Sequence, residues 1–476
     1  MNSFSLIVVG TGFASTFFLK RYLSKAPANA KVLVLERWFP YPQAERLKSL
    51  RGEDSTYTGR NPEAHDTFVS RNADKEWNFA TGFGGSSNCW YGCTPRFMPA
   101  DFQLRTRYGV GQDWPLSYDV LERYYGEAEE LMAISGPAQT PFPKSKPYPL
   151  APHAFSNIDR RLQKEHGNLY VSQPTARASR PVNGRNACCA SAICSVCPVN
   201  AKFTIENGNL GVYDDPRVDV RYGAAVTRLD LQGDAVRGVH FTQDRVEQRA
   251  TGETVALGAN ALFNANILLN SGDTNPFTGK GLGEQVGLNA VVYLDNLQNL
   301  GGSTWVNANG YMLYDGDHRK QHAACLMETN NAPYVRTEKG KFRDIVIFRM
   351  IFEDLPQDGN HVSTTADPLV PTVTFAGHSD YAMRGIAHMK GALPRVLSSL
   401  PIEKILYRNP FPTESHILGS ARMSSSAGEG VVDKHLRHHR YRNLFVLGSS
   451  AFPSYSPSNP TLTLSALSLW AADQSF

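Results

Sequence analysis

Four cysteines lie within ten residues of this sequence, at Cys188, Cys189, Cys194 and Cys197. Thiolate sulfur binds iron–sulfur clusters and zinc, and the spacing C-x4-C-x2-C followed by Pro198 is shared with the ligand runs of iron–sulfur proteins. Structural zinc and a Cys194–Cys197 disulfide are the alternative interpretations. With 7 cysteines in a chain of 476 residues, a disulfide framework like that of small secreted proteins is not expected. We therefore predict a metal site, with an iron–sulfur cluster as the first choice.

A glycine-rich turn near the N-terminus has the residue types that bind a dinucleotide. Gly10 and Gly12 lie between the apolar run of residues 5–9 and a helix-like stretch that begins with Phe13 and Ala14. Glycines at these positions let the amides at a helix start approach a pyrophosphate, whose charge the helix dipole favours. Glu36 ends the next apolar run and offers a carboxylate that can accept the hydroxyls of an adenosine ribose. These five residues are predicted to bind a dinucleotide cofactor.

The elements that must position these residues follow from hydrophobic periodicity. Residues 5–36 predict a strand, a turn, a helix and a second strand, which together form a βαβ unit. Two strand-like runs flank a turn at residues 232–234, and an apolar helix follows residues 254–257, so the dinucleotide-binding architecture resumes in mid-chain. Residues 290–400 alternate strand-like segments with turns, which predicts an antiparallel sheet with one face over a cavity. Residues 137–152 contain six prolines and predict an extended surface connection.

The glycine-rich and aromatic segment 81–96 is similar to a flavin-contacting loop of the glucose-methanol-choline (GMC) oxidoreductases. Segments 108–118, 414–423, 443–450 and 458–463 also resemble that family and occur in its order. The resemblance implies an α/β fold in which a Rossmann-like FAD-binding domain of discontinuous segments accompanies an antiparallel-sheet substrate domain. We assign the FAD-binding domain to residues 1–100, 200–285 and 420–476, the substrate-binding domain to 286–419, and a cover that carries the cysteines to 101–199. Further FAD contacts are implied at Gly84, Gly85, Ser86, Asn88, Val226, Gly448, Ser449, Pro460 and Thr461.

Oxidation of an alcohol to a carbonyl removes a hydride from carbon and a proton from oxygen, so a neutral base must face the flavin. The resemblance places the catalytic histidine of the family at His416 and its partner at Asn459. The Asn459 amide can orient a hydroxyl but cannot act as a second base. Glu353 resembles an acidic active-site position of bacterial members, and an exposed turn glutamate is the alternative interpretation.

The cysteine segment also resembles that of the catalytic subunits of bacterial FAD-dependent glucose and glucoside dehydrogenases, which carry an additional iron–sulfur centre. Those subunits have three residues between the last two cysteines, where this chain has two. The resemblance implies an FAD-dependent dehydrogenase that oxidises a C–OH group of a sugar, glycoside or other alcohol and passes electrons on through an iron–sulfur cluster. The alternatives are an oxygen-using flavoprotein oxidase without a cluster and a zinc-stabilised electron-transfer subunit.

Composition limits the partners and the location of the chain. Lys and Arg total 48 against 44 Asp and Glu, a net charge of +4, which does not favour a nucleic-acid partner. No apolar run approaches the roughly 18 residues of a membrane span, and residues 1–5 have no basic signal-peptide region. We expect a cytoplasmic location by sequence, with periplasmic export possible through a signal-bearing partner. The expected partners are a small alcohol or sugar substrate and an electron acceptor, either a small subunit or a cytochrome.

Overall fold

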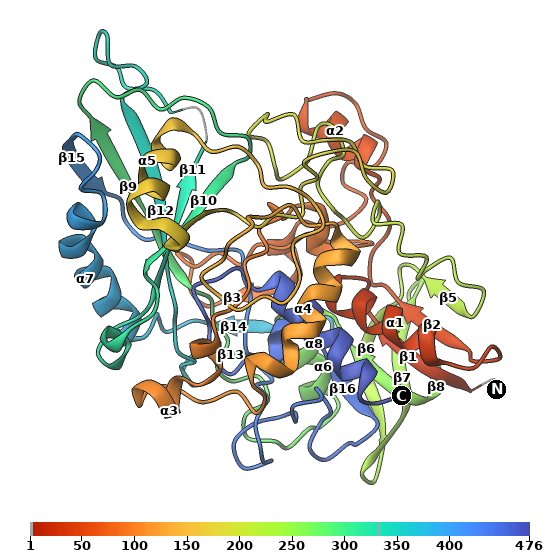
Figure 1. Cartoon of the computed structure of the whole chain (residues 1–476). Helices are drawn as coiled ribbons and strands as arrows, with labels where there is room; N and C mark the ends of the chain where they lie inside the picture. Colours follow the sequence, from red (N-terminus) through yellow and green to blue (C-terminus); the bar gives the residue numbers. More distant parts are fainter. Residues whose placement is uncertain (1–2, 332–333) are drawn as a thin grey trace.

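The computed structural model describes residues 3–331 and 334–476, and two large β-sheets organise them (Figure 1). The first sheet has seven strands in the order β5-β2-β1-β8-β7-β6, with β16 paired to β8. These strands are β1 (Phe4–Val9), β2 (Val32–Leu35), β5 (Val218–Arg221), β6 (Ala225–Gln232), β7 (Ala235–Gln243), β8 (Val246–Leu257) and β16 (Leu444–Val446). Pairing is parallel from β5 through β8 and for β16, and antiparallel between β6, β7 and β8.

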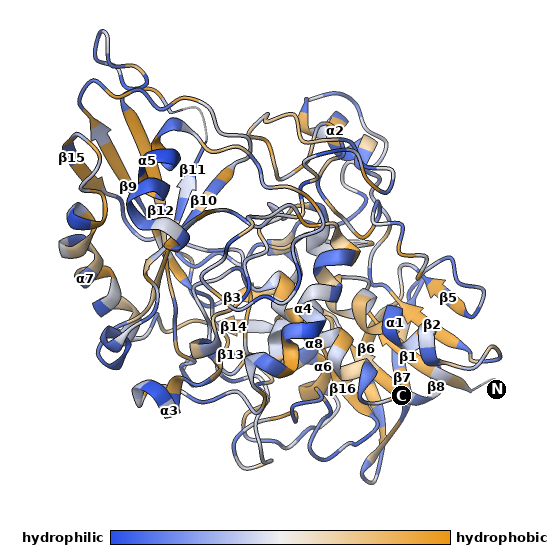
Figure 2. Cartoon of the chain, in the orientation of Figure 1, coloured by the Kyte–Doolittle hydropathy of each residue, from blue (hydrophilic) through white to orange (hydrophobic). Residues whose placement is uncertain are grey.

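The predicted βαβ unit and hairpin are confirmed. Continuous apolar runs form β1 and β2 because strands buried on both faces need apolar side chains on both sides, and Figure 2 shows β2 in orange. Helix α1 (Phe13–Lys25) follows β1, and α6 (Asn260–Asn270) follows β8. The C-terminal helix α8 (Thr461–Asp473) packs against both α1 and α4 (Tyr118–Met132), and it is buried on nearly every side because its side chains are almost all apolar or small.

The second sheet is antiparallel throughout, with the order β15-β9-β12-β11-β10-β4. Its strands are β4 (Tyr170–Ser172), β9 (Val286–Leu294), β10 (Val306–Leu313), β11 (Cys325–Asn330), β12 (Ile345–Phe352) and β15 (Ile402–Tyr407). Helices α5 (Asn157–His166) and α7 (Asp380–Val396) share one hydrophobic core with this sheet. The antiparallel sheet predicted from residues 290–400 is therefore confirmed, and β4 adds a strand from the segment that we assigned to the cover.

Alternation along β11 and β12 gives this sheet two different faces. Met327 and Phe348 point into the core beneath the helices. Glu328, Arg349 and Ile351 line a cavity on the opposite face, as the two-residue period of a strand requires. The cavity face therefore carries charged side chains, although β12 is otherwise apolar.

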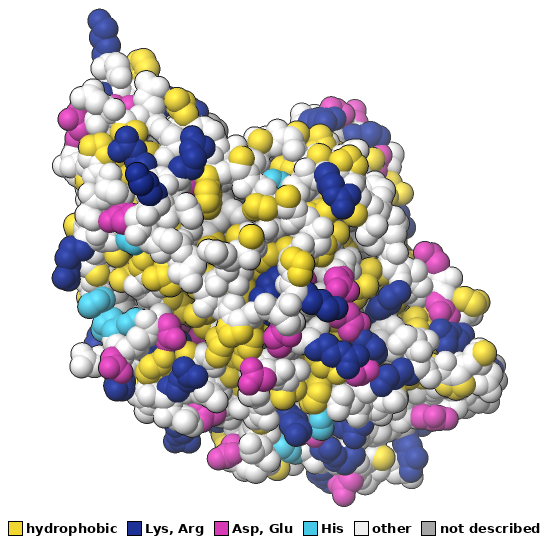
Figure 3. Space-filling view, viewed as in Figure 1, with side chains coloured by type: hydrophobic (Ala, Val, Ile, Leu, Met, Phe, Trp, Pro, Cys, Tyr) yellow, Lys and Arg dark blue, Asp and Glu magenta, His cyan; other side chains and the backbone are white. Residues whose placement is uncertain are grey.

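The remaining elements are short. They are the helices α2 (Gln43–Leu50) and α3 (Leu104–Tyr108), the three-stranded sheet of β3 (Val69–Ser70), β14 (Thr372–Thr374) and β13 (His361–Ser363), and six 3-10 turns at Ala64–Thr67, Gly85–Asn88, Pro99–Phe102, Gly167–Leu169, Asp317–Lys320 and Gly448–Ala451. Neither the proline-rich stretch 137–152 nor the cysteine segment 188–197 contains a helix or a strand. Basic and acidic side chains are interspersed on the face seen in Figure 3. Among the described residues, no helix combines the length and the apolar character needed to cross a membrane.

Candidate active site

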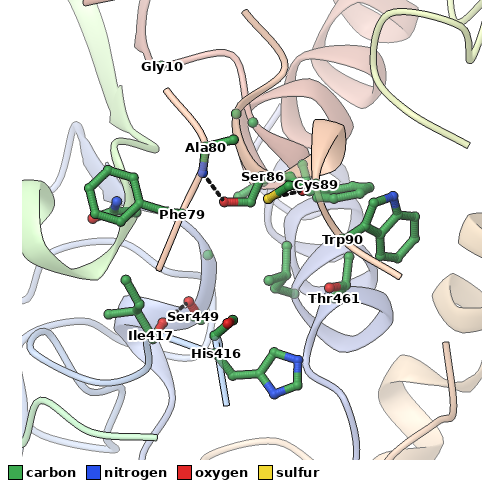
Figure 4. A pocket seen from close by; sticks show the side chains of 18 of the residues that line it. Gly10, Phe79, Ala80, Ser86, Cys89, Trp90, His416, Ile417, Ser449 and Thr461 are labelled. Atoms are coloured by element: carbon green, nitrogen blue, oxygen red, sulfur yellow. Dashed lines mark hydrogen bonds between the residues drawn. The ribbon is translucent and has the colours of Figure 1, made fainter. Parts of the chain in front are cut away.

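A cavity of about 620 Å³ extends from the turn between β1 and α1 to the charged face of the second sheet. Segments from widely separated parts of the chain line it, among them the starts of α1, α6 and α8. Figure 4 shows Ser86, Cys89 and Trp90 on one side of this space, with His416, Ile417 and Ser449 on another. The start of a helix carries partial positive charge, so the cavity favours a ligand with negative charge.

The glycine turn has the shape that a pyrophosphate needs. Gly10 has φ +88°, and a Cβ on it would lie 2.7 Å from the carbonyl oxygen of Gly258, so only glycine fits where β1 approaches β8. A Cβ on Gly12 would meet nothing within 4 Å and would project into open space. Among the residues that the structure describes, no side chain caps the start of α1, which leaves the first-turn amides near Phe13 and Ala14 available to an anion. All four of these predicted residues line the cavity.

Glu36 also lines the cavity, at the end of β2. Its Oε2 accepts hydrogen bonds from the amide and the hydroxyl of Thr11 at 3.1 and 2.7 Å, and its Oε1 accepts from the amide of Trp38 at 3.1 Å. Burial raises the pKa of Glu36, and these hydrogen bonds oppose that rise. The carboxylate is therefore held in one orientation, with acceptor capacity left on Oε1 for a ribose hydroxyl.

The predicted flavin-contacting loop divides into residues that line the cavity and residues that shape the loop. Gly85 and Ser86 line the cavity, as do Val226, Gly448, Ser449, Pro460 and Thr461. The hydroxyl of Ser86 accepts from the amide of Ala80 at 3.3 Å (Figure 4). Gly84 and Asn88 do not line the cavity. The Gly84 amide donates to the Thr11 hydroxyl at 3.0 Å, and the Asn88 side chain donates to the carbonyl of Phe83 at 2.8 Å. Both residues therefore stabilise the conformation of the loop.

His416 and Asn459 both line the cavity, and Figure 4 shows His416 on the side away from Gly10. His416 is half-buried, and its Nδ1 lies 3.0 Å from Oε1 of Gln285. Burial, assisted by the positive charge of Arg349, lowers the pKa of His416 to about 3, so the imidazole is neutral at neutral pH. Its Nε2 forms no hydrogen bond with the part of the chain that the structure describes, and neither does the buried Oδ1 of Asn459. Two acceptor atoms therefore remain available to a ligand in the cavity.

Two charged residues of the cavity, Glu328 and Arg349, were missed by the sequence analysis. Arg349 donates through Nε to Oε2 of Glu414 at 3.0 Å. Burial raises the pKa of Glu328 to about 7, and the charge of Arg349 is the largest opposing influence. A signal exists for Arg349, which is a charged residue inside the apolar strand β12, because such a residue faces a buried polar site when the strand is central. Glu328 is followed by Thr329 and Asn330, so its strand has no such contrast.

The structure does not bring Glu353 to this cavity. Its side chain is 1% exposed, so the interpretation as an exposed turn glutamate is wrong. The carboxylate pairs with Arg319 at 2.5 Å and accepts from the hydroxyl of Tyr381 at 2.7 Å. Arg319 pairs in turn with Asp101 at 2.9 Å. Glu353 thus belongs to a buried charge network of Asp101, Arg319 and Glu353.

The four predicted metal ligands, Cys188, Cys189, Cys194 and Cys197, line one small cavity of about 10 Å³. All are free thiols, so the Cys194–Cys197 disulfide is not formed in this structure. Within residues 3–331 and 334–476, no three His, Cys, Asp or Glu side chains are arranged to hold a metal ion. The Sγ of Cys194 accepts from the guanidinium of Arg177 at 2.9 Å, and that of Cys197 accepts from a backbone amide at 3.2 Å.

Comparison with known proteins adds independent information. Residues 382–468 match the family model described as GMC oxidoreductase. The fructose dehydrogenase large subunit of Gluconobacter japonicus is 28% identical over 437 residues, which cover 82% of this chain and 80% of that protein. The gluconate 2-dehydrogenase flavoprotein of Pantoea cypripedii is 25% identical over 581 residues, covering 98% and 92%.

Solved structures share the fold. The chain is similar to pyridoxine 4-oxidase from Mesorbium loti with a TM-score of 0.70 and 17% identity, covering 100% of this chain and 99% of that one. It is also similar to formate oxidase with a TM-score of 0.64 and 16% identity, covering 99% and 98%. At these identities the similarity shows the fold alone, and this fold agrees with the α/β architecture expected from the sequence.

The open space above Gly12 leads to a first prediction. Gly12 has φ −72°, so Gly12→Val needs no unusual backbone conformation, and its side chain would fill the space at the start of α1. We expect the variant to fold and to lose most of its FAD. Flavin absorbance per protein after purification measures this, with Gly126→Val in α4 as a control, because a Cβ there also meets nothing within 4 Å. Full FAD in Gly12→Val would show that the pyrophosphate lies elsewhere.

Proposed function

This chain belongs to the GMC oxidoreductases, and we propose that it is an FAD-dependent dehydrogenase that oxidises a C–OH group of a sugar, glycoside or other alcohol to a carbonyl. One observation carries this proposal. A single cavity joins a dinucleotide-binding glycine turn to a neutral histidine whose Nε2 has no hydrogen-bond partner among the described residues. The relatives from Gluconobacter and Pantoea, named as dehydrogenases of fructose and gluconate, support a polyhydroxylated substrate.

The residues present fit FAD. The space above Gly12, the amides at the start of α1 and the carboxylate of Glu36 would hold the pyrophosphate and the adenosine ribose. The start of α8 at Thr461 also has no side-chain cap and lines the cavity, so it would favour negative charge on a reduced flavin. When bound, FAD supplies the hydride acceptor.

The chain's own residues then handle the proton. His416 is neutral, so its Nε2 can accept the proton of the substrate hydroxyl as the hydride leaves carbon. The buried Oδ1 of Asn459 lacks a partner among the described side chains, which suits it to orient a substrate group that carries an O–H. Glu328 and Arg349 offer an acceptor and a donor at the same end of the cavity for further hydroxyls.

Three buried cations around the cysteine segment support an iron–sulfur cluster as the route by which electrons leave. Arg177, Arg185 and Lys202 are each at most 2% exposed, and none forms an ion pair with a carboxylate in the described residues. Arg177 donates to Cys194, whereas Arg185 and Lys202 donate to backbone carbonyls. Buried charges require a counter-charge. Thiolates that ligate a cluster would supply it.

The donor set suits a cluster, although the four sulfurs do not form a closed ligand shell in this conformation. Residues 188–197 have no regular secondary structure, so the side chains can approach one another without breaking a helix or a sheet. A cluster supplies one-electron transfer to an acceptor. The Gluconobacter relative is named as a large subunit, which favours a partner subunit for this chain, and we include a small subunit or a cytochrome in the proposal.

An oxygen-using oxidase is the alternative, since the solved relatives with this fold include oxidases. The two activities differ in the fate of the electrons. We expect little hydrogen peroxide and fast reduction of an artificial dye in the presence of substrate. Peroxide formed in equal amount to oxidised substrate would favour the oxidase.

The proposed base leads to a second prediction. His416→Ala should retain FAD but slow the anaerobic reduction of the flavin by substrate about 10²–10⁴-fold, the usual contribution of a positioned acid–base group. Stopped-flow absorbance with a panel of sugars and glycosides measures this rate. His65→Ala is the control, because His65 is 79% exposed and does not line the cavity. Normal reduction by His416→Ala would refute the assignment.

A third prediction concerns the cysteines. Protein isolated without oxygen should contain iron and acid-labile sulfide, and Cys194→Ser should lower both. This variant should still allow substrate to reduce the flavin but should slow reduction of a one-electron acceptor such as a cytochrome. Cys325→Ala is the control, because Cys325 lies in the core of the second sheet. Zinc without iron, or unchanged cytochrome reduction by Cys194→Ser, would contradict the proposed role.

A further inference from the structure

One buried glutamine contacts both the proposed base and the loop that ends in Asn459. Gln285 is 1% exposed and lies immediately before β9. Its Oε1 lies 3.0 Å from Nδ1 of His416. Its Nε2 donates to the backbone carbonyls of Ser456 and Ser458 at 2.7 and 3.0 Å. A single side chain thus joins three segments that are far apart in the sequence.

These contacts fix the orientation of the Gln285 amide. Both hydrogens of Nε2 are used by carbonyl oxygens, which can only accept. A flipped amide would place an oxygen against two carbonyl oxygens at these distances and would lose both hydrogen bonds. In a buried site this loss is unfavourable because no water replaces the missing donors. Oε1 therefore faces His416.

The carbonyls of Ser456 and Ser458 are held in place by contacts of their own side chains. They therefore do not adapt to a flipped Gln285 amide. The hydroxyl of Tyr314 lies 2.8 Å from Oγ of Ser456 and 2.9 Å from Oγ of Ser458. Asp101 accepts from Tyr314 at 2.7 Å and from Ser456 at 2.9 Å. Asp101 also pairs with Arg319, the partner of Glu353. The buried charge network that contains Glu353 therefore holds the loop in place.

The fixed amide determines which nitrogen of His416 carries the proton. Because Oε1 can only accept, the neutral imidazole must donate from Nδ1, and the lone pair must lie on Nε2. A base needs this tautomer if Nε2 is to receive a proton from the ligand. In the opposite tautomer an unprotonated Nδ1 would face Oε1 of Gln285, so two acceptors would repel each other. The proton would then lie on Nε2, which could no longer act as the base.

We propose that Gln285 is a positioning residue that sets the tautomer of His416 and ties it to the loop carrying Asn459. This inference rests on the proposed function, because it assumes that His416 is the base. Gln285 touches neither the cavity nor the expected substrate position, since it is not among the residues that line the cavity. Its effect should therefore appear in the rate of flavin reduction and not in substrate affinity.

Three variants test the proposal. Gln285→Met keeps the approximate side-chain volume but removes every hydrogen bond, and Gln285→Asn keeps an amide that is too short to span both contacts. Each should slow flavin reduction at saturating substrate about 10- to 100-fold, the usual effect of a misaligned catalytic group, with less than about a threefold change in the dissociation constant of the substrate. Gln357→Met is the matched control, because the side chain of Gln357 donates to the carbonyls of its neighbours Leu355 and Pro356.

Gln285→Glu supplies a readout that a purely structural role would not change. The charged groups near His416 are Arg349 on β12, Glu328 on β11 and Glu414 on its own segment. A carboxylate about 3.0 Å from Nδ1 would add negative charge and raise the pKa of His416. The imidazole would then become protonated as the pH falls, and Nε2 would lose its lone pair.

The expected pH profiles follow from the direction of the change in the pKa of His416. In the unaltered protein the pKa of His416 is lowered to about 3, so protonation of His416 should not slow flavin reduction between about pH 5 and pH 8. Gln285→Glu should lose rate as the pH falls through this range, by at least about tenfold. At high pH one carboxylate oxygen accepts from Nδ1 and keeps the tautomer, whereas the other faces the carbonyls of Ser456 and Ser458 without a proton to donate. Gln285→Glu should therefore be faster than Gln285→Met but slower than the unaltered protein. Anaerobic stopped-flow reduction measures all of these rates.

The outcomes separate this inference from the proposed function. Normal flavin reduction by His416→Ala would overturn the role of His416 itself. Loss of activity in His416→Ala together with unaltered rates in Gln285→Met and Gln285→Asn would overturn only the role of Gln285. A Gln285→Glu profile that is flat and no faster than that of Gln285→Met would also overturn it. If Gln285→Met fails to retain FAD, the pH profiles of Gln285→Asn and Gln285→Glu decide the question.

Discussion

Unpaired polar atoms around one buried cavity are the constraint on which the rest of this structure depends. The first-turn amides of α1, the Oδ1 of Asn459 and the Nε2 of His416 all face this space without a partner among the described residues. Buried polar groups are normally satisfied. These atoms suit a ligand that offers negative charge near the start of α1 and hydroxyl groups near His416, as a dinucleotide and an alcohol do.

Buried charge serves a different purpose in each part of the molecule. Arg319 is compensated by two carboxylates, Asp101 and Glu353, and this closed network fixes a loop without entering the chemistry. Arg177 and Lys202 have no carboxylate partner within the described chain, and they lie beside free thiols. The first pattern is typical of a structural ion network. In the second pattern the cations donate to neutral acceptors, namely backbone carbonyls, neutral side chains and the Cys194 thiol.

The second sheet connects the hydrophobic core to the cavity because its two faces differ. One face of β11 and β12 is apolar and packs on α5 and α7, which gives the sheet a rigid core. The other face presents Glu328 and Arg349 to the cavity. A rigid sheet is a suitable support for a substrate site, since groups on regular elements are held more accurately than groups on loops.

The sequence by itself determined the apolar strands of the first sheet, the glycine turn at Gly10 and Gly12, and the order of the segments that resemble GMC oxidoreductases, because all of these are local patterns. The tertiary structure alone decided which side chains meet. Gln285 and His416 are 131 residues apart, and Glu353 turns to Arg319 and away from the cavity. A local pattern fixes the type of an element and the alternation of its faces, whereas contacts between distant segments depend on register and packing, which no short stretch of sequence encodes.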